Sequence, residues 1–503
     1  MTELPHLPLI KLTSDLPRLK KRGYSDLSPR TPTEREAFSK KAHEDCGKIF
    51  ADFKQLQEEY RGSIDPELIF RIDLKGSVKP SEIERLGLKL LTIIDKNAII
   101  VFSSKKHFED FFAKLDEYTT DSKPRKHPFL DAFIDLKEIL QESKKGPHLN
   151  KTPLGKGERA ILDIEFWFLG DDRVSVRQMD KWSSELKNII IENGGEWFGQ
   201  LRTKSFYVMR VRLDQLLINK IIKLPQIASI ERPSRAKLSV GHIKEQPIDD
   251  LDVFEPSPDA PGVLVIDSGI VPGHPLLSKA VGEAKSFIYG KTPVDQCGHG
   301  TSVAGLTLYG DINKCINNKN FYPDCWIFSA RVLDEDGKYN DQKLIESQFI
   351  KSLYLFTNQY PKIKVINISI GNADEIFRLG KRQFRWAYLI DEKLYELSRI
   401  NKDLIIVVSV GNADEEPNYD NYPENIFCDE SKLINPATSA LAITVGSLSP
   451  GLDSNNPKNH PIAGHLGFPS PFTRTGPGLG GMIKPDLVEI GGDGADVLGD
   501  APF

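Results

Sequence analysis

The chain has no long apolar run, few cysteines and little excess charge of either sign. In its 503 residues, no stretch approaches the roughly 18 apolar residues that a membrane-spanning helix needs. The formal net charge is -5, and the basic clusters are interleaved with acidic residues, so we expect no nucleic-acid surface. A hydrophobic content of 39% and a charged content of 27% are typical of a soluble globular protein without a membrane partner.

The five cysteines are scattered along the chain: Cys46, Cys297, Cys315, Cys325 and Cys428. There is no Cys-x-x-Cys motif, no close pair of histidines and no decisive spacing of acids, so we expect no metal and no cofactor. The N-terminal stretch lacks a basic region followed by an apolar run, so no signal peptide is expected. Reduced thiols in the cytoplasm fit this pattern, whereas a pair between Cys315 and Cys325 would require secretion.

A length of 503 residues corresponds to about three domains. Residues 1–62 are expected to form an N-terminal arm that is first polar and then helical. Apolar residues recur in this arm at steps of three and four: Phe38, Ala42, Cys46, Ile49, Phe53 and Leu56. We expect the helix to lie on its own domain, and a coiled arm is the alternative.

Two segments repeat the order strand, helix, strand, strand, helix. Residues 63–120 predict strands at 68–74, 88–95 and 98–103, helices at 79–87 and 105–118, and a turn at Lys96 and Asn97. Residues 159–239 predict strands at 160–168, 196–203 and 205–213 and helices at 176–195 and 214–225. We infer two ferredoxin-like α+β units. Between them we expect a charged connector at 121–158 with an amphipathic helix at 129–140.

The C-terminal half begins near residue 259, after a linker at 240–258 whose prolines keep the chain extended. The apolar strand GVLVIDSG at 262–269 carries Asp267 at its end. The segment CGHGTSVAG at 297–305 places His299 at the Gly-rich start of a helix, and the strand IIVVSVGN at 405–412 delivers Asn412. Strand ends and strand-to-helix junctions are where an open α/β sheet builds its active site.

Six motifs in this half occur in a familiar order. They are DSG around Asp267, HGTSVAG from His299, SIG at 369–371, SVGN ending on Asn412, NPATSALAITVGS at 435–447, and TRTGP before IKPD at 483–486. Together they resemble the subtilisin-like serine proteases, or subtilases, over about half of the chain. The resemblance implies an α/β fold, a doubly wound parallel sheet, for residues 259–503.

The same resemblance implies a role for each motif. His299 would be the general base, and Asp267 would orient its imidazole and stabilise the cationic form. Asn412 would donate its amide to the developing oxyanion. Ser369, Ile370 and Gly371 resemble the edge that pairs with the backbone of a protein or peptide substrate.

The nucleophile is not identified in this sequence. In the family, a GTSxAxP segment follows the stretch that IKPDLVEIGG resembles, and the sequence ends at Phe503 about where that segment would begin. Ser439 superficially echoes the motif, but it leads into an apolar strand rather than a helix. We therefore expect an incomplete serine endopeptidase that is inactive alone. A peptide-binding pseudoprotease and one half of a split protease are the alternatives.

Four further expectations concern the surroundings of this site. The stretch IASIERPSRAKLS at 227–239 resembles the exit strand and tail of a ferredoxin-like propeptide, so the second unit would either inhibit the protease or be a permanent docking module. A charged insertion at 374–401 should be largely helical, with Trp386 and Tyr388 either rimming the cleft or packing beneath it. The imidazole two residues away should lower the pKa of Cys297 and make its thiol reactive. An AAA-type ATPase that presents substrates is a conceivable partner.

Overall fold

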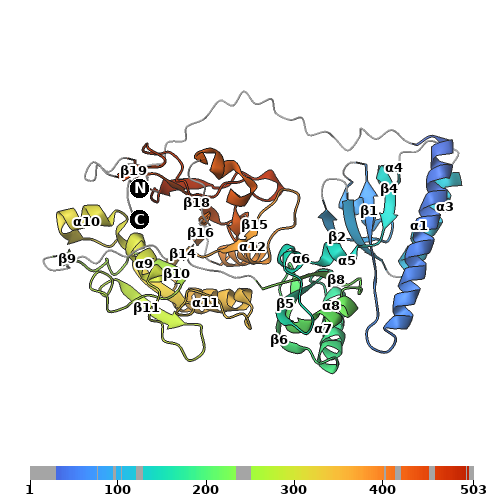
Figure 1. Ribbon diagram of the computed structural model, residues 1–503, viewed down its shortest axis with the longest axis horizontal. Coiled ribbons are helices and arrows are strands. Elements are labelled where there is room, and N and C mark those ends of the chain that lie inside the picture. Colours follow the sequence, from blue (N-terminus) through green and yellow to red (C-terminus); the bar gives the residue numbers. More distant parts are fainter. Residues whose placement is uncertain are drawn as a thin grey trace.

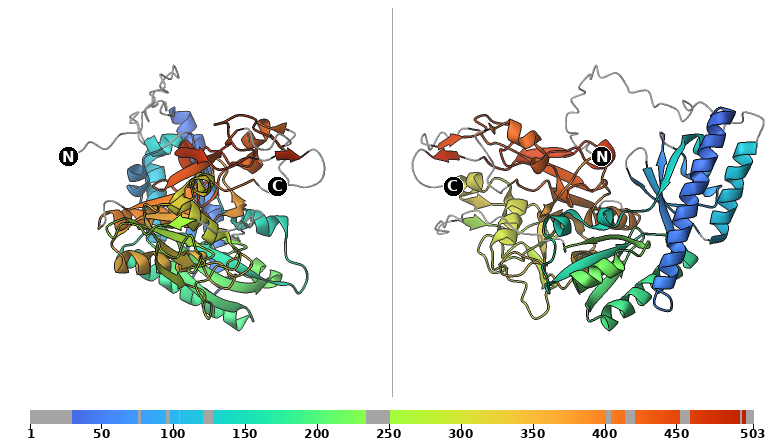
Figure 2. Two further views of the ribbon diagram at one scale, coloured as in Figure 1. Left: turned by 90° about the vertical axis from the view of Figure 1, so that its left-hand side faces the viewer. Right: turned by 45° about the vertical axis from the view of Figure 1, so that its right-hand side comes forward.

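The computed structural model describes residues 30–75, 78–94, 98–103, 105–120, 128–233, 251–400, 404–413, 421–451, 459–493 and 495–497. Three parts follow one another in space: a first unit at one end, a second unit in the middle and a C-terminal domain at the other end (Figure 1). The view turned by 45° shows the same order (Figure 2). The expected turn at Lys96 and Asn97, the arm before residue 30, the tail and linker at 234–250 and the chain end at Phe503 lie outside the described residues.

The first unit is an antiparallel sheet with the strand order β2-β3-β1-β4. Its elements are β1 (Leu68–Leu74), α2 (Pro80–Glu84), β2 (Lys89–Ile94), β3 (Ala98–Ser103), α3 (Lys105–Thr120), α4 (Pro128–Ala132) and β4 (Phe133–Lys137). This is the strand order of a β-α-β-β-α-β unit of the ferredoxin-like kind.

Strand β4 corrects the prediction of a helix at 129–140, and it places part of the expected connector in the first sheet. The pairing of β4 with β1 shifts register so that Leu74 faces Phe133 while Asp73 faces Asp135. This β-bulge skips one residue, so Phe133 and Leu136 both reach the core although they are three residues apart. A spacing of three imitates the period of a helix, which explains the wrong prediction.

Helix α1 (Pro32–Glu59) begins with a capping box in which Thr31 and Glu34 bind each other's backbone N–H. It packs along α3 and β4, and the side chains that it buries there include Phe38, Ala42, Cys46 and Ile49. The helical part of the arm therefore lies on its own domain, as expected.

The second unit has the same sheet order, β6-β7-β5-β8. Its elements are α5 (Gln141–Lys144), α6 (Pro147–Lys151), β5 (Arg159–Phe166), α7 (Arg173–Glu192), β6 (Glu196–Arg202), β7 (Tyr207–Asp214), α8 (Gln215–Ile221) and β8 (Ile227–Glu231). The two units are joined by polar and apolar contacts. Trp182 Nε1 donates to Glu67 at 2.9 Å, Lys223 pairs with Glu59 at 2.7 Å, and Ile69 packs into the core of the second unit.

The C-terminal domain is built on a seven-stranded sheet in which every neighbouring pair is parallel. In spatial order the strands are β11 (Val281–Ser286), β13 (Trp326–Arg331), β10 (Gly262–Asp267), β14 (Ile363–Ile368), β16 (Ile405–Ser409), β18 (Ile443–Leu448) and β20 (Leu487–Ile490). From β10 the chain first builds β11 and β13 on one side and then β14 onward on the other. The switch point, where such sheets bind ligands, lies between β10 and β14.

Helices cover both faces of this sheet, as a doubly wound fold requires. Alternate residues of β10 belong to two cores, one with α11 (Ile345–Gln359) and α12 (Arg385–Ser398) and the other with α9 (His299–Tyr309). The remaining elements are α10 (Ile312–Asn318) and the short strands β12 (Asn320–Phe321), β15 (Asn372–Ile376), β17 (Ile434–Asn435), β19 (Asn459–Pro461) and β21 (Ala495–Val497). The expected α/β architecture is confirmed.

Part of the expected linker is ordered against this domain. Strand β9 (Asp252–Val253) pairs in parallel with β12, and the ring of Phe254 stacks on that of Tyr322 with 4.2 Å between centroids. Prolines remove backbone donors only at their own positions, so the proline-free stretch between them is able to add a strand.

The second unit docks on the C-terminal domain through a buried group of charges. Asp163 of β5 is fully buried and accepts a hydrogen bond from Arg210 Nε at 2.7 Å. Arg385 of α12 also binds Asp163, and its Nε lies 3.2 Å from Glu346 of α11. The apolar side chain of Val208 extends the core of the C-terminal domain across the same interface. In this group each side supplies one carboxylate and one guanidinium, and a further ion pair crosses the interface from Arg382 to Glu165 of β5 at 2.7 Å.

This arrangement predicts that Arg385→Ala strongly destabilises the folded chain, because Glu346, which is 2% exposed, loses its cation. Breaking a buried pair from one side costs about 3–5 kcal/mol of unfolding free energy. Lys204→Ala is the matched control, since the Lys204 and Glu396 pair crosses the same interface but Lys204 is exposed. Urea unfolding measures both variants, and equal effects would contradict the role of the buried cluster.

Candidate active site

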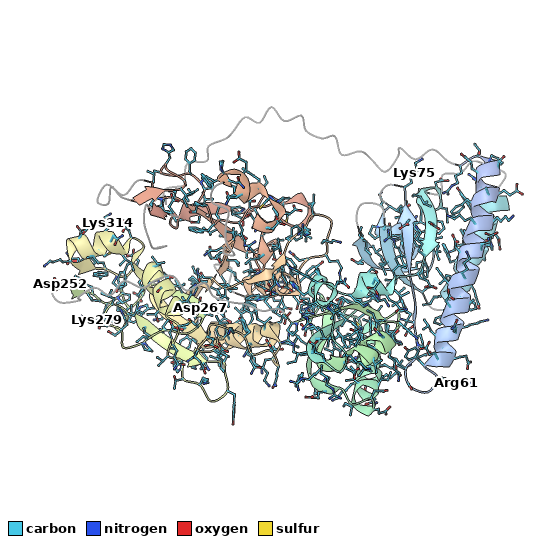
Figure 3. The ribbon with its side chains drawn as sticks, in the orientation of Figure 1. Arg61, Lys75, Asp252, Asp267, Lys279 and Lys314 are labelled. Atoms are coloured by element: carbon cyan, nitrogen blue, oxygen red, sulfur yellow. The ribbon has the colours of Figure 1, made fainter. Side chains whose placement is uncertain are left out.

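Asp267 and His299 meet at the carboxyl end of β10. Asp267 is fully buried, and its Oδ1 lies 2.8 Å from His299 Nδ1 on the first residue of α9. Figure 3 labels Asp267 within the C-terminal domain. An ionised carboxylate only accepts hydrogen bonds, so Nδ1 carries the proton. The other ring nitrogen, Nε2, is then the one that is able to take a proton from a nucleophile.

The pKa of His299 lies above its ordinary value. Burial lowers this pKa, but the hydrogen bond and negative charge of Asp267, together with the charge of Asp295, outweigh the effect of burial. The carboxylates therefore stabilise the imidazolium, which is the form that a general base takes during acyl transfer.

Asp295 is a site residue that the sequence reasoning missed. Helix α9 has Gly298 as its N-cap, with a φ of 85° and no side chain to cap the first turn. Asp295 supplies the cap instead: its carboxylate accepts the N–H of Gly298 at 2.9 Å and both the N–H and the hydroxyl of Thr301, at 2.9 and 2.7 Å. These contacts hold the backbone on both sides of His299. An acid shortly before the helix start is the only sequence feature that points to this role.

The other expected site residues lie on the two strands beyond β10. Strands β10, β14 and β16 are neighbours, so Asp267, Ser369 and Asn412 follow adjacent strand ends that are about 4.8 Å apart. Asn412 is exposed, and its backbone is fixed because Arg474 Nε donates to its carbonyl oxygen at 2.8 Å. Of the expected substrate edge, Ile370 is 2% exposed and faces the core. Ser369 and Gly371 on either side of it are half-buried, and their pairing with a substrate stays a prediction.

Ser439 is not placed to act as a nucleophile. It is fully buried, and its hydroxyl donates to Asp391 Oδ1 at 2.5 Å while accepting the N–H of Ala442 at 3.1 Å. Within the described part of the chain, no serine hydroxyl is hydrogen-bonded to His299, whose ring partner is Asp267.

The expectation of a lowered pKa at Cys297 is wrong. Burial raises the pKa of this thiol, and the Asp295 carboxylate, 3.6 Å from its Sγ, opposes ionisation further. Asp295 stands two residues before Cys297, just as His299 stands two residues after it, but the prediction considered only the imidazole. Trp386 was expected either to rim the cleft or to pack beneath it. Packing is correct, since Trp386 is fully buried and its ring lies edge-on to that of Phe349.

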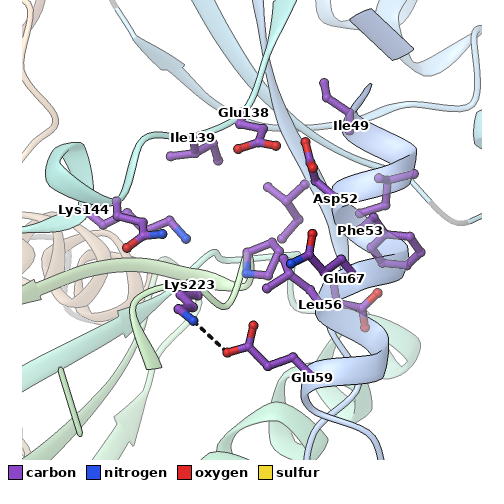
Figure 4. A pocket seen from close by; sticks show the side chains of 15 residues that line it. Ile49, Asp52, Phe53, Leu56, Glu59, Glu67, Glu138, Ile139, Lys144 and Lys223 are labelled. Atoms are coloured by element: carbon purple, nitrogen blue, oxygen red, sulfur yellow. Dashed lines mark hydrogen bonds and ion pairs between the residues drawn. The ribbon is translucent and has the colours of Figure 1, made fainter. Parts of the chain in front are cut away.

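A pocket of about 370 Å³ lies between α1 and the two ferredoxin-like units. Figure 4 shows its lining, with Lys223 reaching Glu59 across the pocket and Glu138 near Asp52. All of its lining residues come from the N-terminal half, so it is separate from His299.

Among the described residues, no group of three His, Cys, Asp or Glu side chains is placed to hold a metal ion. None of the described helices is long and apolar enough to cross a membrane.

The sequence profile of the Subtilase family matches residues 259–501, which contain the Asp267 and His299 pair. The C-terminal half of the chain belongs to the subtilase family. Two further profiles match the N-terminal half: the Y4kK N-terminal domain at 36–140 and the Y4kK central domain at 143–232. These ranges coincide with the first unit, including α1, and with the second unit.

Two relatives and one solved structure illustrate the likeness. The uncharacterized protein y4kK of Sinorhizobium fredii is 23% identical over 299 residues, which cover 55% of this chain and 89% of y4kK. The serine protease AprX of Bacillus subtilis is 24% identical over 229 residues, and the match spans 46% of each chain. A cold adapted subtilisin-like serine proteinase is 18% identical, with 52% of this chain and 71% of that chain covered at a TM-score of 0.29.

We predict that Asp295→Asn lowers the pKa of His299 and destabilises α9. The neutral amide removes the negative charge near the imidazole, and its NH₂ group is unable to accept from Thr301. NMR titration of the His299 ring measures the pKa, and thermal unfolding should show a loss of about 1–2 kcal/mol for the cap. Asp334→Asn is the control, since Asp334 accepts backbone N–H groups in an exposed turn. An unchanged pKa in Asp295→Asn would contradict the assigned role.

We also predict that Cys428 reacts with an alkylating reagent before Cys297. Cys428 is exposed, whereas Cys297 is partly covered and has a raised pKa. Mass mapping after limited alkylation gives the order of labelling. Faster labelling of Cys297 would show that the surroundings of His299 are more open and less acidic than described.

Proposed function

We propose that the subtilase domain hydrolyses peptide bonds as a serine endopeptidase, with Asp267, His299 and Asn412 in its active site. Membership of the family makes the domain a protein of the serine-protease kind. The observation that carries the finer proposal is the 2.8 Å contact between buried Asp267 and the Nδ1 of His299. A binding protein that does not cleave peptides has no need of a histidine base that a buried carboxylate orients.

In the proposed reaction, Nε2 of His299 takes the proton from a serine hydroxyl as the oxygen attacks the scissile carbonyl. The Asn412 amide stabilises the oxyanion that forms, and His299 returns the proton to the leaving amine. The substrate backbone pairs with the edge that Ser369 and Gly371 provide. His299 must be neutral to begin the cycle, so activity falls as the pH is lowered through its raised pKa.

The serine itself would come from a GTSxAxP segment outside the residues described. Strand β20 supports the docking of a further segment on this part of the domain. It forms one edge of the sheet, and it exposes Leu487, Val488 and Ile490 to between 45 and 51%. Exposed apolar side chains on a sheet edge mark a surface that another segment covers. That segment would belong either to the same polypeptide or to a second one.

We propose that the second unit restrains the protease rather than serving as a permanent part of it. The support is the balance of charge at their interface, where Arg210 pairs with Asp163 on one side and Arg385 with Glu346 on the other. Separation leaves Asp163 with Arg210 and Glu346 with Arg385, and of the three buried carboxylates only Glu165 gives up its cation, Arg382. Permanent docking remains the alternative, and an AAA-type ATPase partner stays a prediction of the family resemblance alone.

A peptide-binding pseudoprotease is the second candidate function. The observation that favours it is that, in the described residues, no serine hydroxyl contacts His299. Such a protein would use the same substrate edge without cutting.

We predict that the 503-residue polypeptide alone is not labelled by a serine-reactive fluorophosphonate probe. In subtilisin, loss of the nucleophilic serine lowers turnover by a factor of about 2 × 10⁶, which is about as much as loss of the whole triad. The same chain extended by a GTSxAxP segment of a subtilase should be labelled on that serine, and His299→Ala should abolish the labelling. Labelling of the unextended chain would show that one of its own serines acts. No labelling of the extended chain would favour the pseudoprotease.

A further inference from the structure

Two glycines line the space between the candidate substrate edge and the oxyanion donor. Gly371 ends the edge, and Gly411, with a φ of 83°, directly precedes Asn412. A Cβ atom at position 371 would lie 2.8 Å from Cδ1 of Ile434, and a Cβ at position 411 would lie even closer to the same atom. The end of the Ile434 side chain therefore occupies the space between the two segments.

Ile434 is held firmly in this position. It is 4% exposed and is the first residue of β17, which pairs with β15 directly after Gly371. Its carbonyl oxygen accepts the N–H of Ala437 at 2.7 Å, and the preceding Leu433 donates its N–H to Thr475 at 3.1 Å. Backbone hydrogen bonds on both sides, together with close packing, oppose a movement of the side chain out of the space.

We infer that Ile434 restricts the substrate to peptides with a small residue, Gly, Ala or Ser, immediately before the scissile bond. This inference rests on the proposed function. The residue before the scissile bond contributes the carbonyl whose oxygen meets Asn412, and its backbone lies along the edge that ends at Gly371. Its side chain branches from the Cα atom bonded to that carbonyl carbon and so starts between Gly371 and Gly411.

A large side chain at that position would collide with a buried isoleucine. Well-packed interiors have little free volume, so accommodating it would require the backbone of β17 to shift. A methyl or hydroxymethyl group is short enough to stop before Ile434. The two glycines and the isoleucine thus act together: the glycines let the Ile434 side chain reach between the two segments, and Ile434 limits the depth that is left for the substrate.

Binding of product-like peptides to the 503-residue chain tests this inference without needing turnover. Four dye-labelled peptides would differ only in their C-terminal residue, Gly, Ala, Leu or Phe, whose free carboxylate replaces the scissile carbonyl. Fluorescence anisotropy should show the Ala peptide binding at least about tenfold more tightly than the Phe peptide. In Ile434→Ala the difference should disappear or reverse, because the vacated volume admits the larger side chain.

Two matched variants separate size from a general loosening of the fold. Ile434→Val keeps most of the side chain and should keep the preference for Ala. Ile327→Ala removes the same atoms from a fully buried residue of β13, away from the two glycines, and this variant should also keep the preference for the Ala peptide. A wild-type chain that binds Phe as tightly as Ala, or an unchanged preference in Ile434→Ala, would overturn the inference while leaving the proposed function intact.

Asn412→Ala tests the proposed function separately. It should weaken the binding of every peptide, whatever its last residue. The amide of Asn412 contacts the C-terminal carboxylate of the peptide and not the side chain of its last residue. If no peptide binds to any form of the chain, the proposed function fails and the inference about Ile434 fails with it.

Discussion

The geometry of the whole candidate site depends on the buried carboxylate of Asp267. A charge removed from water at the end of a parallel strand is costly unless hydrogen-bond donors surround it. Both donors meet Oδ1: the backbone N–H of Ser268 at 2.7 Å and Nδ1 of His299 at the start of α9, whereas the buried Oδ2 has no hydrogen-bond partner in the described residues. Helix α9 must therefore begin beside β10. Asp295 satisfies this requirement by capping the helix at the point where His299 faces the strand.

Around this pair, the parallel strands position the candidate site residues, and the second unit packs against the domain at a distance from them. The strands β10, β14 and β16 bring Asp267, Ser369 and Asn412 to one end of the sheet. The second unit adds no side chain to the Asp267 and His299 pair in the hydrogen bonds described, but it packs on α11 and α12 behind the sheet. The restraint proposed for this unit would therefore act through the interface of the two parts.

Much of the fold was predictable because it depends on local patterns. Short apolar runs between turn and helix signals predicted β1, β3 and β5, and the small residues after His299 predicted α9. The site pair was predictable because both residues stand at element ends within distinctive motifs. Strand β4 was not, since a bulge gave its apolar residues the spacing of a helix. The place of Ile434 beside Gly371 and Gly411 depends on contacts between distant segments, which no local pattern encodes. Asp295 and the raised pKa of Cys297 depend instead on how one short loop folds, because Asp295 lies two residues before Cys297 and six before Thr301.

The serial order of the three parts has a mechanical consequence. In the described residues, the first unit makes its hydrogen bonds and ion pairs with the second unit and none with the subtilase domain. Within the described residues, a force applied to α1 therefore reaches the subtilase domain through the second unit. It would act on the interface around Asp163 and Arg385, so the first unit would influence the proposed restraint and would not act directly on the Asp267 and His299 pair.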